Sequence, residues 1–102
     1  MSYNTPEGKV KRKVIDVLKK HGVWYFFPAN NGFGKAGIPD VIAIVKGRFF
    51  GIEVKSDRTK KPTVLQTLCG DEIRSAGGLW MVVCDNESLD LLETVIKEYL
   101  YR

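Results

Sequence analysis

The sequence lacks the marks of a membrane-spanning, secreted or repeat protein. Its longest apolar stretches, such as residues 41–45, are far shorter than the roughly 20 residues that span a bilayer. It has no apolar signal segment at its start, no repeats and no low-complexity tract. Its only two cysteines, Cys69 and Cys84, form no CxxC pair, so we expect small buried side chains in preference to a disulfide or a zinc site. These absences predict a protein of the reducing cytoplasm.

The composition is that of one folded domain with an uneven distribution of charge. A chain of 102 residues, 44% hydrophobic and 27% charged, predicts a single domain over residues 1–102. The net charge is +4, but residues 1–20 and 46–61 each carry six basic and two acidic side chains, whereas residues 70–102 carry three basic and seven acidic ones. Such asymmetry suits a polyanion bound on one face. On charge alone, lysines and arginines that merely solvate helix surfaces remain an equal alternative.

Hydrophobic periodicity and turn residues predict a mixed α/β fold. The predicted elements are a helix that begins at Thr5-Pro6 and ends before Gly22, strands at 24–28, 41–45 and 49–55, a helix at 62–76, a strand at 79–84 and a helix at 89–100. The short turn at residues 46–48 favours an antiparallel hairpin. The order α-β-β-β-α-β-α predicts a mixed sheet flanked by helices.

Two of these helices are expected to bury particular faces. Glu7 precedes Val10 by three residues and Val14 by seven, so we expect it to continue the core-facing stripe of the first helix. A carboxylate in such a stripe calls for a functional reason. In the helix at 62–76 the expected inner and flanking residues are Leu65, Leu68, Cys69, Glu72, Ile73 and Ala76.

The segment from Gly32 to Gly37 fits the pattern GxGxxG of dinucleotide-binding proteins, but its context does not. That motif requires a helix to begin within the glycines, so that backbone amides hold the pyrophosphate. Here Ile38-Pro39-Asp40 and a β-branched run follow instead, and no GxxxxGK[ST] loop occurs. We therefore expect no nucleotide cofactor, and a glycine-rich loop beside a strand.

The prediction of a metal-binding site rests on three charged residues in the hairpin. Asp40 begins one apolar strand, and Glu53 and Lys55 share one face of the next. Across a hairpin the start of one strand meets the end of the other, so the three side chains can converge. Two carboxylates repel each other unless a cation lies between them, and oxygen ligands select magnesium or manganese. The alternative is a buried ion pair that only stabilises the hairpin.

These residues also resemble a known family. The segment Gly37-Ile38-Pro39-Asp40, followed by Glu53-Val54-Lys55, is similar to the PD-(D/E)xK nuclease core, and more narrowly to the VRR-NUC branch with its short stand-alone members from phages and bacteria. A helix bearing Gln66 and closing at Gly77-Gly78 continues the resemblance over nearly the whole chain. The resemblance implies a restriction-endonuclease-like core and a metal-dependent endonuclease that hydrolyses phosphodiester bonds.

The resemblance also implies roles for individual residues. The metal ligands would be Asp40, Glu53, the backbone carbonyl of Val54 and, directly or through water, Glu7. Lys55 would orient or deprotonate the attacking water, and Gln66 would support the site or hold a phosphate. For Glu7 and Gln66, a helix-start acid and a solvated polar residue remain the alternatives.

The expected partner is DNA, with branched DNA such as a four-way junction as the substrate that the family implies. The candidate phosphate contacts are Lys9, Lys11, Arg12, Lys13, Lys35, Arg58, Lys60 and Lys61. A homodimer would pair two cuts. Aromatic residues could supply its surface, although such residues are more often part of the core: Phe26, Phe27, Phe33, Trp80 and Tyr101. A non-catalytic nucleic-acid-binding module and an RNA-directed nuclease are the alternative functions.

Overall fold

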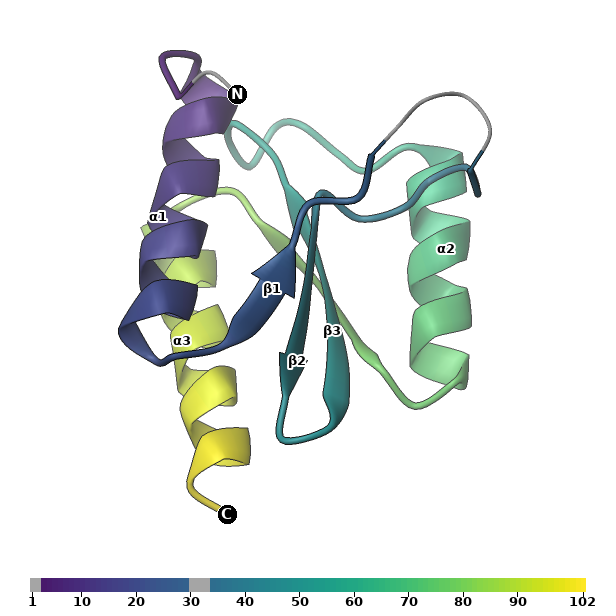
Figure 1. Ribbon diagram of the computed structural model, residues 1–102. Helices are drawn as coiled ribbons and strands as arrows, with labels where there is room; N and C mark the ends of the chain where they lie inside the picture. Colours follow the sequence, from purple (N-terminus) through teal and green to yellow (C-terminus); the bar gives the residue numbers. More distant parts are fainter. Residues whose placement is uncertain (1–2, 30–33) are drawn as a thin grey trace.

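The computed structural model describes residues 3–29 and 34–102 and confirms the predicted order of elements. The elements are α1 (Pro6–Lys20), β1 (Trp24–Phe26), β2 (Val41–Val45), β3 (Arg48–Val54), α2 (Val64–Ser75), β4 (Leu79–Val83) and α3 (Asn86–Leu100). The strands form one mixed sheet in the order β1-β2-β3-β4, antiparallel except for the parallel pair β3–β4. Figure 1 shows α1 and α3 on one face of this sheet and α2 on the other.

The main core lies between the sheet and the helices α1 and α3. Alternate residues of each strand point to this face, because side chains alternate along an extended strand. The buried side chains of this layer include Val14, Leu18, Val41, Val45, Phe50, Ile52, Val54, Leu92 and Ile96. Fixing the central strands β2 and β3 against two helices gives a rigid base for the strand ends at which the candidate site lies.

Helix α2 begins two residues later than predicted and buries a different face. Thr63 is its N-cap, in a capping box with Gln66, so Pro62 lies outside the helix. The helix meets the sheet through Cys69, Gly70 and Ile73, whereas Leu65 and Leu68, predicted to lie on the inner or flanking face, are more than half exposed, and Glu72 and Ala76 are exposed too. A Cβ on Gly70 would stand 2.4 Å from the Trp80 ring. This close contact sets which side of α2 faces inward.

The side chains proposed for a dimer surface divide into three groups. Phe26 and Tyr101 are exposed, as such a surface requires. Trp80 is only 7% exposed and Phe27 is packed against the core, so the expectation was wrong for these two. Trp80 is buried because the Arg74 side chain and α2 cover it. Phe33 lies outside the described residues.

Two further expectations concern membranes and cysteines. Within residues 3–29 and 34–102, no helix is long and apolar enough to cross a membrane. Cys69 is buried and Cys84 is half-buried, and both are free thiols.

Candidate active site

The β2–β3 hairpin brings Asp40 and Glu53 together, as the sequence predicts. Lys46 and Gly47 close the hairpin with φ angles of 49° and 80°, the paired left-handed conformation that two-residue turns require. The register pairs Val41 with Ile52, so Asp40 stands opposite Glu53 one step beyond that pair. A carboxylate oxygen of Asp40 accepts a hydrogen bond of 2.8 Å from the Val54 backbone N–H. Asp40 therefore continues the pairing of β2 with β3 by one position, and the backbone of β3 holds its carboxylate.

Among the described residues Glu53 is the one charged residue that is buried, and it is fully buried. Burial, followed by a hydrogen bond with Asp40 and repulsion from its charge, raises the pKa of Glu53 to about 8, and Glu7 adds further repulsion. The ammonium of Lys55 acts in the opposite direction. The ionised form of a carboxyl group placed in this way is unfavourable unless a cation binds beside it.

Gln66 joins Glu53 to Lys55. Its amide nitrogen donates a hydrogen bond of 3.0 Å to Glu53 Oε1. Its amide oxygen accepts two hydrogen bonds, 3.0 Å from Lys55 Nζ and 2.8 Å from the Thr63 backbone N–H. With donors on one side and a carboxylate on the other, the orientation of the amide is fixed. The start of α2 thus positions the two functional ends of the E-x-K sequence.

Gly37 allows the Asp40 segment to approach α2. Its φ is +77°, and a Cβ there would stand 2.2 Å from the Leu65 backbone carbonyl. No other residue type fits without moving the backbone. The Gly-Ile-Pro-Asp segment consequently lies against the first turn of α2, with Pro39 fully buried. This contact brings Asp40 and Gln66 to the same pocket of about 460 Å³.

The residues around Glu53 fit a metal ion in part. When both carboxyl groups are ionised, Glu53 Oε2 is buried and no donor from the described residues reaches it. In an extended strand the N–H and C=O of one residue point to the same side, so the Val54 carbonyl points to the side of β3 on which Asp40 lies. Two carboxylates and a carbonyl form a hard oxygen set suited to magnesium or manganese.

Glu7 is placed differently from the prediction. Its side chain is exposed, and the neighbouring Gly8 is buried in its place, so the expected inward stripe does not reach Glu7. It nevertheless lies near enough to raise the pKa of Glu53. In the part of the chain that the structure describes, no three acidic, histidine or cysteine side chains gather as a ready metal cage. Any role for Glu7 at the metal therefore requires movement or a bridging water.

The candidate phosphate contacts surround the site unevenly. Lys11 and Lys35 line the pocket with Asp40; Lys11 also lies over the Phe27 ring and Lys35 pairs with Glu72 at 3.1 Å. Lys9 is exposed, Arg12 pairs with Asp16, and Lys13 donates to the Asn86 side chain. Arg58 pairs with Asp85 at 2.6 Å, and Lys60 and Lys61 line a second pocket with it.

Two residues of the site's framework were not singled out from the sequence. Thr63 supplies the backbone N–H that orients Gln66, and a sequence signal for it existed, because Thr63-Val64-Leu65-Gln66 is a capping-box pattern. Gly37 was noted only as part of a family motif. Its close contact with Leu65 is made across distant parts of the chain, which no local pattern reveals.

Comparison with known proteins agrees with this arrangement. Residues 5–68, well over half of the chain, match the family described as archaeal Holliday junction resolvase (Hjc). The chain belongs to this Holliday junction resolvase family. The match runs from the N-cap of α1 into α2, so it includes Asp40, Glu53, Lys55 and Gln66.

A solved structure has the same fold as this chain. A structure titled "VRR_NUC domain" has a TM-score of 0.76 and 27% sequence identity, and the match covers 86% of this chain and 94% of that one. A search of curated proteins finds no match. This Holliday junction resolvase family member is therefore a restriction-endonuclease-like protein of the PD-(D/E)xK nuclease superfamily.

Proposed function

We propose that this chain, as one VRR-NUC-like nuclease domain over residues 1–102, is a metal-dependent endonuclease that cuts branched DNA such as four-way junctions. The observation that carries the proposal is the Gln66 amide, which holds Glu53 with its nitrogen and Lys55 with its oxygen beside Asp40. A structural ion pair needs no such bridge. A buried acid with an elevated pKa, next to a second acid and a lysine in a pocket, is typical of a catalytic site.

The proposed chemistry is hydrolysis of a phosphodiester bond. Asp40, Glu53 and the Val54 carbonyl are the ligands that we assign to Mg²⁺ or Mn²⁺, with Glu7 joining directly or through water. Such an ion, when bound, lowers the pKa of water and stabilises charge on the scissile phosphate. Lys55 orients or deprotonates the attacking water and offsets negative charge on the phosphate. Gln66 positions Lys55 and Glu53 through the two hydrogen bonds of its amide.

The proposed substrate contacts are electrostatic and independent of base sequence. Lys11 and Lys35 lie at the pocket and are assigned to phosphates next to the cut. The other assigned phosphate contacts extend the basic surface along α1 and the loop after β3, namely Lys9, Arg12, Lys13, Arg58, Lys60 and Lys61. Contacts of this kind supply affinity, while branch geometry supplies selectivity.

The proposed assembly is a homodimer, because resolving a junction needs two paired cuts. One row of neighbouring side chains lies on the same face of the sheet as α2, and it is exposed: Trp24 by 59%, Ile44 by 43% and Phe49 by 38%. Phe26, whose ring lies 5.5 Å from the Trp24 ring between centroids, is exposed too and extends this row. A second copy of the chain is the occupant that we assign to this face.

One set of assays tests the proposed function. Labelled four-way junction, flap, linear duplex and RNA are incubated with the protein, with and without Mg²⁺ or Mn²⁺. We expect metal-dependent cutting of branched DNA, lost in Asp40→Asn and Lys55→Ala and kept in Lys97→Ala, which removes an exposed charge far from the pocket. Binding of branched DNA without cutting would identify a non-catalytic module, and cutting of RNA alone would identify an RNA-directed nuclease.

A further inference from the structure

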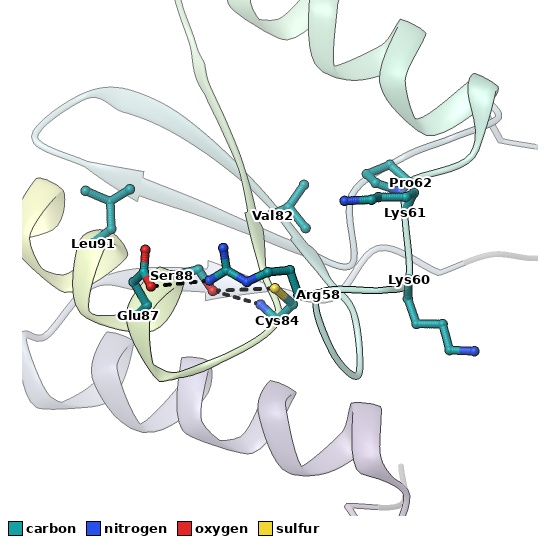
Figure 2. A pocket seen from close by; sticks show the side chains of 9 residues that line it. All are labelled: Arg58, Lys60, Lys61, Pro62, Val82, Cys84, Glu87, Ser88 and Leu91. Atoms are coloured by element: carbon teal, nitrogen blue, oxygen red, sulfur yellow. Dashed lines mark hydrogen bonds and ion pairs between the residues drawn. The ribbon is translucent and has the colours of Figure 1, made fainter.

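A second pocket lies where the chain leaves β3 and approaches the start of α2. It has a volume of about 480 Å³ and is lined by the loop after β3, the end of β4 and the first two turns of α3 (Figure 2). Val82 forms part of it, and the β3–β4 register makes Val82 the direct neighbour of Glu53 on the same sheet face. Adjacent strands stand about 4.8 Å apart. The pocket is therefore next to the candidate active site.

The lining combines basic side chains with apolar surface. Arg58 is held by Asp85 at 2.6 Å and by Glu87 at 3.4 Å, so its charge is largely balanced. Lys61 has no ion-pair partner among the described residues, and Figure 2 shows its ammonium directed across the opening toward Val82. Lys60 also lines the pocket, but its side chain is directed away from Val82 and Leu91 in the same view. Pro62 and Leu91 complete the apolar part of the lining.

We propose that this pocket receives one unpaired nucleotide of the DNA branch, with its phosphate at Lys61 and its sugar or base against Val82, Leu91 and Pro62. The inference rests on the proposed function and names the part of the substrate that the pocket recognises. A volume of this size is typical of a site for one small ligand. A base in an intact duplex is stacked and paired, so it cannot enter. Near a branch point, taking a nucleotide out of the stack costs less.

The two neighbouring lysines provide a matched pair of variants. Binding is measured in Ca²⁺, without cutting, to a forked duplex with unpaired arms and to a blunt duplex of equal length. We expect Lys61→Ala to weaken binding of the fork about tenfold and of the blunt duplex about twofold at most. We expect Lys60→Ala to weaken binding of both DNAs equally, because the Lys60 ammonium is directed away from the apolar lining. An equal loss on both DNAs for Lys61→Ala would overturn the proposal.

Cys84 lines the pocket and reports its occupancy directly. A thiol reagent should modify Cys84 more slowly when the forked duplex is bound, and at an unchanged rate when the blunt duplex is bound. Cys84→Ala identifies the signal, since Cys69 is buried. Equal rates with both DNAs at saturation would contradict the inference. If the protein cuts branched DNA yet neither readout separates fork from duplex, only the pocket assignment fails; if it binds neither DNA, the proposed function fails.

Discussion

The replacement Glu53→Gln should raise the free energy of unfolding of the metal-free protein. It should also abolish the metal-dependent cleavage of DNA. Glutamine keeps the oxygen that accepts from Gln66, and its amide group can donate a hydrogen bond toward Asp40 in place of the proton that Glu53 shares with it. It also removes the charge that burial makes unfavourable. Most substitutions of buried polar residues lower the free energy of unfolding. A gain in stability would therefore be specific to the unfavourable burial of the Glu53 charge beside Asp40.

The size and the pH range of the effect follow from the pKa of Glu53. In the unfolded chain Glu53 ionises near pH 4.5, whereas in the folded protein it keeps its proton to about pH 8. The unfolded state therefore releases the proton first, and the free energy of unfolding falls as the pH rises from about 4.5 to about 8. At 1.36 kcal/mol per pKa unit, the full difference above pH 8 has a ceiling of about 5 kcal/mol. We expect Glu53→Gln to exceed the wild type there by roughly 2–4 kcal/mol.

Urea unfolding in EDTA at several pH values between 5 and 9 measures this difference. The exposed carboxylate variant Glu98→Gln is the control and should follow the wild type. Adding Mg²⁺ should raise the stability of the wild type at high pH, because a ligand that binds only the folded state shifts the equilibrium, and it should leave Glu53→Gln unchanged. A wild-type stability that does not change between pH 5 and 8, or a less stable Glu53→Gln at pH 8.5, would refute the reasoning.

Three further predictions test the supports of the site. Gly37→Ala should lower the free energy of unfolding by about 2 kcal/mol or more in urea, because the new Cβ meets the Leu65 carbonyl, whereas Gly34→Ala, in open space, should change little. Gln66→Ala should reduce junction cleavage by roughly 10–100-fold with the fold retained, and a loss below threefold would count against its positioning role. Ile44→Asp should convert a dimer to a monomer in light scattering without lowering the melting temperature; an unchanged dimer would locate the interface elsewhere.

Local patterns predicted the hairpin and its carboxyl pair well. The alternation in β2 and β3 and the Lys46-Gly47 turn are short-range features, and a hairpin with a tight turn has its register fixed by that turn. Once the register is fixed, Asp40 must stand opposite Glu53. The meeting of these two residues was therefore predictable from sequence before any family resemblance was considered.

Features that depend on long-range packing were not predictable in the same way. The inward face of α2 is set by the contact of Gly70 with Trp80, which joins a helix to a later strand. Helical spacing alone allowed Leu65 and Leu68 to be core residues. Helical periodicity placed Glu7 on the buried face of α1, but that face ends before Glu7. In the first turn of the helix the buried residue is Gly8.

Cleavage of a supercoiled plasmid that extrudes a cruciform tests the central claim most directly. Two paired cuts across the junction within one binding event give linear DNA, whereas separate cuts give nicked circles first. With Mg²⁺ or Mn²⁺ we expect linear product from the wild type and none from Lys55→Ala. An intact plasmid in the presence of either ion, or equal cleavage by Lys55→Ala, would contradict it.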